Sequence, residues 1–356
     1  MTALFGPSFT SEDSELMNFL TTPEHSAFLE GLWERFRRYL KSAEETEFRD
    51  LEAQPHPRIW EMYLAIALSE QGFTLSEKLR EGPDIKLSDP IVWVEAVVST
   101  DGDKGDKKSH AASRLPEIVT SAAVWGGPPE DKIIERLLTS IKEKNNKLTG
   151  YDDRKGKYHP GYVEKGLVRD TDPYVIALNT YKTSFAQFDH QHTAGHIPLV
   201  AKALFGYGET VLLSLFPRDG RSAPISSDRF DYLYRRHLEA KEEKRVPTNI
   251  FFQEGYSGIS ALILSKEGFW TWMHRIPVPL SENFIVAHNP FARNPLPNGW
   301  LKSGHEIWIE QGQLHKRIWK NGSEHLKECF PLPTLVSMSG DGRRNYQRVS
   351  NVSAFR

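Results

Sequence analysis

The sequence predicts an α/β (α+β) fold with an N-terminal helical segment and a C-terminal β-rich extension. Two patterns predict it. Apolar residues recur at helical spacing in residues 11–48, 57–71 and 130–148, whereas other short runs are continuously apolar, as in buried strands. These strand-like runs are residues 91–98, 173–179, 258–265 and 284–290. We expect a helical segment over residues 1–54, a core domain over 55–297, and a hairpin with a tail over 298–356.

The composition is that of a globular protein. The 356 residues are 39% hydrophobic and 26% charged, and the net charge is −2. Without a global positive field, any binding of nucleic acid requires a local basic patch. The single cysteine, Cys329, excludes an internal disulfide and a zinc site built from several cysteines. No apolar run reaches the about 20 residues of a membrane span, and residues 1–10 lack the pattern of a signal peptide, so we expect a cytoplasmic protein without membrane contact.

Helices are predicted before the first strand of the core. Residues 11–48 carry apolar side chains at helical spacing. A further helix opens at Pro57 and ends at Gly72, and residues 73–79 then predict a strand. Glu61 lies on the border of the apolar face of that helix, which consists of Trp60, Tyr63, Leu64, Ala67 and Leu68.

Residues 82–98 place two carboxylates around a buried strand. Asp84 precedes a turn, and Glu95 lies inside the apolar run of residues 91–98. Because strand side chains alternate, Trp93, Glu95 and Val97 share one face. An ionised carboxylate inside an apolar strand costs several kcal/mol unless it is compensated. A divalent cation held by Asp84 and Glu95 is one such compensation; a turn aspartate followed by an edge-strand glutamate is the alternative.

The helix predicted over residues 130–148 carries a lysine on its apolar stripe. At about 100° per residue, Lys144 lies within the stripe, whereas Lys142 and Lys147 point away from it. A lysine on an inward face is uncommon unless it meets an anion or extends its ammonium to solvent. Both interpretations of Lys144 stay open on the sequence.

Residues 149–170 interleave cations with aromatic rings. Such a pattern suits a nucleic-acid strand, with cations on phosphates and rings on bases, although a solvated loop is the alternative. The predicted substrate-binding residues here and at the end of the preceding helix are Lys142, Arg154, Lys155, Lys157 and Tyr158.

The second half of the chain offers a different candidate site. His190, His192 and His196 are spaced as ligands of zinc or iron, but Gly195 favours a loop and no established metal-binding framework accompanies them. Beyond the core, residues 306–309 and 314–319 predict a hairpin followed by polar loops.

Pro83-Asp84, ten intervening residues and then Glu95-Ala96-Val97 resemble the half-motif of the PD-(D/E)xK nuclease superfamily. The resemblance extends over residues 58–297 and implies a restriction-endonuclease-like mixed central sheet flanked by helices. It implies Mg²⁺ (or Mn²⁺) as cofactor, with Asp84 and Glu95 as ligands and Glu61 as a third acidic ligand from the preceding helix. Val97 stands where this family has a lysine. In some members a lysine from a neighbouring element serves instead, and here the resemblance nominates Lys144, with Lys142 and Lys86 as fallbacks.

Together these features predict a metal-dependent nuclease that hydrolyses phosphodiesters, with DNA preferred over RNA as its partner. The alternative is a catalytically degenerate nuclease fold that binds nucleic acid or a protein. An enzyme built on the three histidines is a third interpretation. A homodimer is compatible with the sequence, which does not define substrate structure or sequence specificity.

Overall fold

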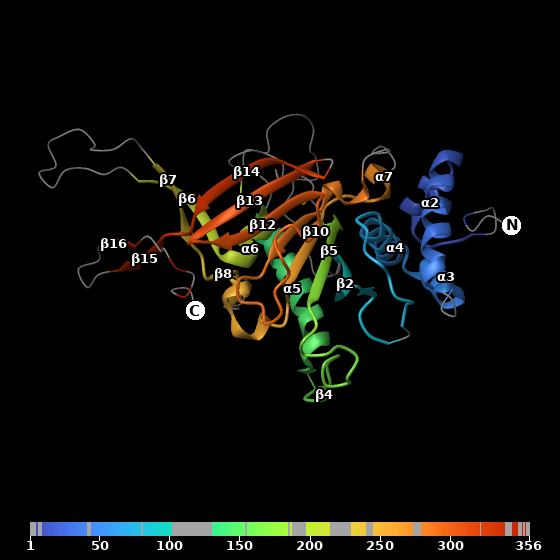
Figure 1. Cartoon of the computed structure of the whole chain (residues 1–356), viewed down its shortest axis with the longest axis horizontal. Coiled ribbons are helices and arrows are strands. Elements are labelled where there is room, and N and C mark those ends of the chain that lie inside the picture. Colours follow the sequence, from blue (N-terminus) through green and yellow to red (C-terminus); the bar gives the residue numbers. More distant parts are fainter. Residues whose placement is uncertain are drawn as a thin grey trace, which may run out of the picture.

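An eight-stranded mixed sheet forms the centre of the computed structural model (Figure 1). Its strands, in spatial order, are β1 (Ile85–Ser88), β2 (Ile91–Thr100), β5 (Tyr174–Lys182), β10 (Ala261–Ser265), β11 (Ile285–His288), β12 (Gly304–Glu310), β13 (Gln313–Lys320) and β14 (Ser323–Pro331). The structure describes residues 5, 9–40, 44–79, 81–101, 130–153, 155–183, 186, 197–213, 229–239, 245–272, 279–320, 322–338, 344–347, 351 and 353.

The strands that position the candidate site are β1, β2, β5 and β10. β1 and β2 form an antiparallel hairpin in which Ile85 lies opposite Val94. β5 is parallel to β2 and to β10, and β10 is antiparallel to β11. The first seven residues of β5 are buried, as expected for a parallel strand covered on both faces. The expected α/β architecture, with N-terminal helices and C-terminal strands around a mixed sheet, is therefore present.

The two faces of β2 meet different helices. On one face, Val92, Val94 and Ala96 pack in the core that contains α4 (Pro55–Glu70). On the other face, Trp93 packs in the core that contains α5 (Glu130–Thr149). This division follows from the alternation of side chains along a strand. Side chains of α4 and side chains of α5 that face the sheet therefore lie on opposite sides of it.

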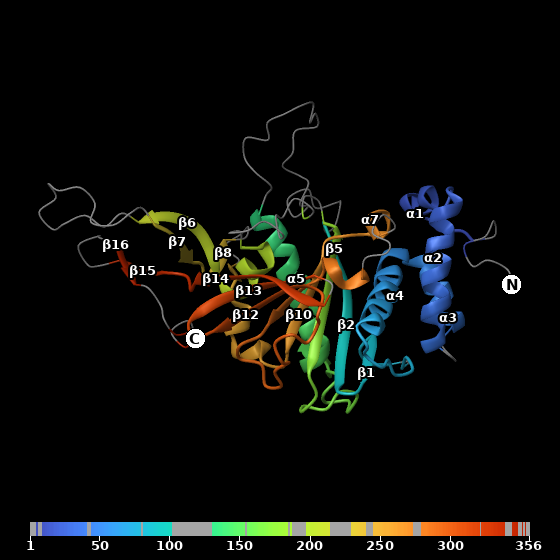
Figure 2. The ribbon, with the colours of Figure 1, turned by 45° about the horizontal axis from the view of Figure 1, so that its top comes forward.

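The remaining helices flank the sheet and one another. α2 and α3 pack on α4, and Figures 1 and 2 show these blue helices at one end of the molecule, with the β6–β7 and β15–β16 hairpins at the opposite end. The helices are α1 (Ser14–Phe19), α2 (Pro23–Phe36), α3 (Glu44–Ala53), α6 (Leu199–Phe205) and α7 (Phe269–Trp272), with 3-10 turns at Arg37–Tyr39, Ile250–Phe252, Glu254–Tyr256 and Leu280–Asn283. Each described helix is too short or too polar to cross a lipid bilayer.

Four two-stranded ribbons lie outside the main sheet. They pair β3 (Tyr151–Asp152) with β4 (Tyr158–His159), β6 (Tyr207–Leu213) with β7 (Arg229–Tyr234), β8 (His237–Glu239) with β9 (Arg245–Pro247), and β15 (Leu335–Met338) with β16 (Arg344–Gln347). Only the first of them adjoins α5 in the chain, and it becomes important for the site.

Two local expectations are wrong. Residues 73–79 form no strand and contribute a single bridge, from Leu75 to Leu87. The Ser76 amide still donates to the Lys86 carbonyl of β1, but the Lys78 amide donates to the Tyr39 carbonyl, away from the sheet. The predicted polar tail contains β14, which pairs along β13, and the β15–β16 hairpin.

A buried carboxylate, Glu306, is paired among the C-terminal strands. Glu306 on β12 is 1% exposed. His288 Nε2 lies 2.8 Å from its Oε1, and Arg317 Nε donates to its Oε2 at 3.0 Å. Burial alone would raise the pKa of Glu306, but hydrogen bonds from His288, the Gly299 amide and Arg317 outweigh burial and lower it to about 2.

We expect Glu306→Gln to lower the free energy of unfolding by about 3 kcal/mol at neutral pH. Because the folded-state pKa is depressed, this contribution is present above the ordinary glutamate pKa and is lost as the pH falls towards about 2. Urea unfolding at neutral and acidic pH measures it. Glu324→Gln is the control, since Glu324 also contacts Arg317 but its side chain is 44% exposed, so its loss stays below about 1 kcal/mol. A pH-independent loss in Glu306→Gln contradicts the prediction.

Candidate functional site

Glu95 is the buried centre of the candidate site. It lies in the middle of β2 and is 1% exposed. The alternation along β2 turns its side chain, like that of Trp93, towards α5. The carboxylate is thus enclosed by the sheet on one side and by a helix on the other, where an unpaired charge would be very costly.

Two lysines of α5 neutralise Glu95. Lys144 Nζ lies 2.7 Å from Glu95 Oε1, and Lys147 Nζ lies 3.0 Å from the same oxygen. The two lysines are three residues apart, so they share one side of the helix. Their side chains differ in exposure, at 14% for Lys144 and 50% for Lys147. The structure therefore brings Lys144, the lysine that the resemblance nominates, to Glu95.

The prediction for Lys147 is wrong. Its position lies off the apolar stripe, but its long side chain reaches from the border of the helix back to Glu95. Lys142, the first fallback, is exposed on the far side of α5. Lys86, the second, lies 4.8 Å from the centre of the Trp93 ring, on the face of the hairpin that Glu95 also occupies.

A tyrosine outside the predicted set completes the environment of Glu95. The Tyr162 hydroxyl donates to Glu95 Oε2 at 3.3 Å, and the Tyr162 amide donates to the Lys147 carbonyl at 2.8 Å. Gly161 permits this approach, because a Cβ there would lie 2.3 Å from the Leu148 carbonyl oxygen. The sequence signal was the Gly-Tyr pair in the loop after α5, but only the folded turn shows where the ring points.

Asp84 lies beside Glu95 at the entrance to β1. Its Oδ2 accepts a hydrogen bond from the Ala96 amide at 2.7 Å, and the β1–β2 register places Ile85 opposite Val94. Asp84 is partly exposed, whereas Glu95 is buried. The hairpin therefore presents one buried and one accessible carboxylate at the same place.

Burial raises the pKa of Glu95, and the charge of Asp84 raises it further, while Lys144 and Lys147 act in the opposite direction. Burial raises the pKa of Tyr162 and of Tyr174, and the charge of Glu95 adds to both. Lys147 is affected differently: burial would lower its pKa, but Glu95 outweighs burial and raises it. The ammonium of Lys147 and both phenols thus keep their protons at neutral pH.

Glu61 does not join this cluster, so the expected set of three convergent carboxylates is wrong. Glu61 is 2% exposed on α4, on the opposite face of the sheet. Its carboxylate pairs with Arg58 Nη1 at 2.7 Å and with the Lys78 ammonium. Residues 59–68 of α4 are buried all round, so Glu61 does not lie on the border of an apolar face. The pairing of α4 with the other side of β2 is not visible in the sequence.

The predicted substrate-binding residues lie around the end of α5. Lys155, Lys157 and Tyr158 are exposed on the β3–β4 hairpin. Arg154, His190, His192 and His196 lie outside the described residues.

The donor set at Asp84 and Glu95 suits a hard divalent cation. Carboxylate oxygens are the preferred protein ligands of Mg²⁺ and Mn²⁺, and Mg²⁺ is commonly held by one or two carboxylates together with water and substrate phosphate oxygens. Burial is the main cause of the raised pKa of Glu95, and the charge of Asp84 adds to it. A shared cation would relieve this repulsion between the two carboxylates. The residues present therefore fit such an ion with two protein ligands.

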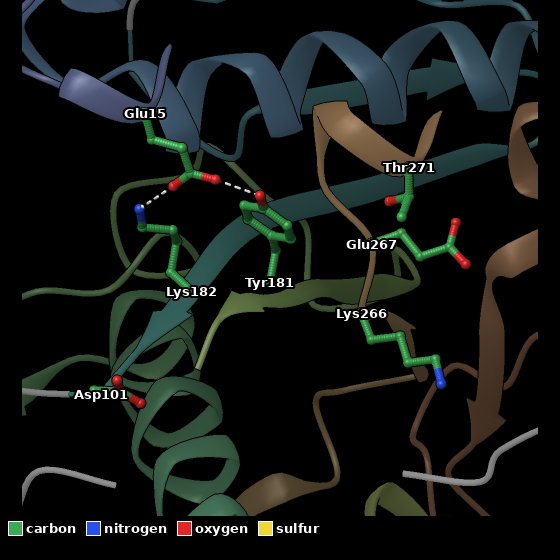
Figure 3. A pocket seen from close by; sticks show the side chains of 7 residues that line it. All are labelled: Glu15, Asp101, Tyr181, Lys182, Lys266, Glu267 and Thr271. Atoms are coloured by element: carbon green, nitrogen blue, oxygen red, sulfur yellow. Dashed lines mark hydrogen bonds and ion pairs between the residues drawn. The ribbon is translucent and has the colours of Figure 1, made fainter. Parts of the chain in front are cut away.

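A separate acidic group lies at the carboxyl ends of β2, β5 and β10. Within the described part of the chain, Asp13, Glu15 and His56 form the only group of three metal-type ligands, with ligand atoms within 4.8 Å of one another. Figure 3 shows Glu15 bonded to Tyr181 and Lys182 beside a cavity of about 650 Å³. Lys182 Nζ lies 2.7 Å from Glu15, and Asp13 caps the first turn of α1. Glu15 thus holds α1 against β5, and Asp13 caps α1 and bonds to His56 of α4.

The chain matches no protein-family model, no curated protein and no solved structure. The candidate site consists of Asp84, Glu95, Lys144, Lys147 and Tyr162. We call these five residues the acid–lysine cluster.

We expect the two lysines to contribute unequally to stability. Lys144→Met removes the more buried ammonium from a carboxylate that stays buried, so the free energy of unfolding should fall by about 2 kcal/mol or more. Lys147→Met removes a half-exposed partner and should cost less than about 1 kcal/mol. Urea unfolding of both variants measures the difference, and equal losses contradict the assignment of Lys144 as the principal counter-ion.

Proposed function

We propose that the protein is a metal-dependent nuclease of the PD-(D/E)xK type that hydrolyses phosphodiesters, with DNA as its preferred substrate. The observation that carries the proposal is the contact between Lys144 of α5 and the buried carboxylate of Glu95, beside Asp84. A β-hairpin supplies the two acids and a helix supplies the lysine that Val97 does not. In this interpretation the central sheet is a restriction-endonuclease-like one.

Asp84 and Glu95 would hold the cation through carboxylate oxygens. The chemistry that a divalent ion supplies there is neutralisation of phosphate charge and activation of water. Tyr162 and Lys147 keep the Glu95 carboxylate in one orientation by bonding to different oxygens. Preorganised groups of this kind stabilise charge without rearranging during the reaction.

Hydrolysis of a phosphodiester consumes one water molecule and needs no other reactant. A bond forms between the water oxygen and phosphorus as the bond from phosphorus to the leaving sugar oxygen breaks. One proton leaves the water, and the leaving oxygen takes up a proton from solvent. Lys144 lies where its ammonium can orient the attacking water or stabilise the negative charge that develops on the phosphate.

A second candidate function is a fold of this type that binds nucleic acid or a protein without cutting. One observation favours it: Glu95 Oε1 already accepts from both ammonium groups, so the cluster is neutralised by its own residues. The two functions differ in whether a divalent ion can compete for the carboxylates.

We expect Mg²⁺- or Mn²⁺-dependent cleavage of plasmid DNA by the wild-type protein. Asp84→Asn, Glu95→Gln and Lys144→Met should each lower the rate by roughly 100-fold or more, because each removes a charged group from the reacting centre. Glu143→Gln is the matched control: it removes a carboxylate next to Lys144 on the exposed side of α5 and should cleave normally. Cleavage that is equal in all variants contradicts the proposal.

We also expect Mn²⁺ to bind through Asp84 and Glu95, and calorimetric titration can measure it. Binding requires the ionised carboxylates. Because the pKa of Glu95 is raised, the affinity should begin to fall at a higher pH than for an ordinary glutamate as the solution is acidified. Glu95→Gln should abolish the binding. Wild-type protein that binds no Mn²⁺ while it still binds DNA would favour the non-cutting alternative.

A further inference from the structure

The β3–β4 hairpin carries most of the exposed large apolar side chains in the described part of the chain. These are Leu79, Tyr151 and Tyr158, which are 45%, 39% and 49% exposed, and both tyrosines lie on this one hairpin. Aromatic rings are normally buried because their apolar area is large. Tyr151 lies opposite His159 and Tyr158 opposite Asp152, so the two rings lie on opposite faces of the ribbon. One exposed ring on each face of so short a ribbon points to a hairpin that meets a ligand.

The rings are held in fixed positions. Tyr151 lies opposite His159 in the ladder, and the two rings stack with their centres 5.0 Å apart and an angle of 16° between their planes. The Tyr158 hydroxyl donates to Glu164. Asp153 accepts hydrogen bonds from the Lys155 and Lys157 amides at 2.8 and 2.9 Å, which closes the loop between the strands.

The hairpin is also tied to the acid–lysine cluster on both sides. It follows α5 after Gly150, only a few residues beyond Lys147, and it leads into the Gly161–Tyr162 turn. Lys147 and Tyr162 both contact Glu95, so the two chain segments that flank the hairpin meet at the buried carboxylate. Figure 1 shows β4 at the end of α5, projecting from the body of the molecule. The rings are therefore carried by a hairpin whose two flanking segments both contact the candidate site.

We propose that this hairpin stacks on unpaired nucleobases, and that the substrate is nucleic acid with unpaired bases next to the scissile phosphate. The inference rests on the proposed nuclease function and names its substrate class. In a duplex the base faces are covered by neighbouring pairs, and only a single strand, a loop or a junction presents them to an aromatic side chain. Exposed Lys155 and Lys157, between the two strands that bear the rings, suit the phosphates of such a strand.

The test compares the binding of three fluorescent probes by anisotropy in EDTA, where metal-dependent cleavage is absent. The probes are a short oligothymidine, an abasic oligonucleotide with the same number of phosphates, and a duplex of the same length. Wild-type protein should bind oligothymidine at least about fivefold more tightly than the abasic strand, because stacking adds to the phosphate contacts. Tyr151→Leu and Tyr158→Leu should each reduce this ratio towards one.

Matched variants distinguish the effect of ring stacking on affinity from the effects of charge and of misfolding. Tyr158→Phe keeps the ring and should keep the ratio, although it loses the bond to Glu164. Lys157→Met should weaken the binding of oligothymidine and of the abasic strand by the same factor, because its effect is on phosphate contacts. Circular dichroism of each variant establishes that it is folded.

The outcome distinguishes this inference from the proposed function. Equal wild-type affinity for oligothymidine and the abasic strand, or an unchanged ratio in both tyrosine-to-leucine variants, overturns the stacking surface even if plasmid is cleaved. A base-dependent ratio in a protein that cleaves nothing supports the stacking surface and overturns the hydrolysis. Tighter binding of the duplex than of oligothymidine also overturns the substrate class.

Discussion

The burial of the Glu95 carboxylate is the constraint on which the rest of the site depends. A charge in the middle of a sheet strand is tolerated only if its partners are supplied within the fold. Lys144 and Lys147 supply the charge, and Tyr162 occupies the other oxygen. The end of α5 and the turn after the β3–β4 hairpin must therefore be placed against β2, and this requirement links three segments that are distant in the sequence.

The two faces of the sheet differ in the groups that they bury. Towards α4 the sheet is apolar, and nearly the whole second half of that helix is buried. Its one buried acid, Glu61, is neutralised by Arg58 and Lys78 on the same side. Towards α5 the same strand carries Glu95 among apolar neighbours. Glu306 follows the same rule at the far end of the sheet, where His288 and Arg317 compensate its burial.

The segment from α5 to Tyr162 contributes both buried and exposed groups near the candidate site. Its helix neutralises the buried carboxylate, and its hairpin exposes rings and cations a short distance along the chain. Because the hairpin leaves the helix at Gly150 and returns at Gly161, where the backbones are in close contact, its position relative to Glu95 is well defined. A mobile substrate-binding loop would lack this coupling. In the proposed nuclease, this arrangement would connect base recognition with the reacting centre through packed backbone.

The sequence by itself determined the helices and strands with strong periodicity, the placement of Glu95 inside an apolar strand, and the inward position of Lys144. Each depends on local spacing, which a single segment contains. Only the tertiary structure decided that α4 and α5 cover opposite faces of β2, which removes Glu61 from the site, and that Lys147 and Tyr162 reach Glu95. β14 escaped prediction because its exposed, charged face has no apolar run, and its strand conformation comes from pairing with β13. Which helix covers which face of a sheet, and how far a long side chain reaches, depend on contacts between distant segments that local patterns do not record.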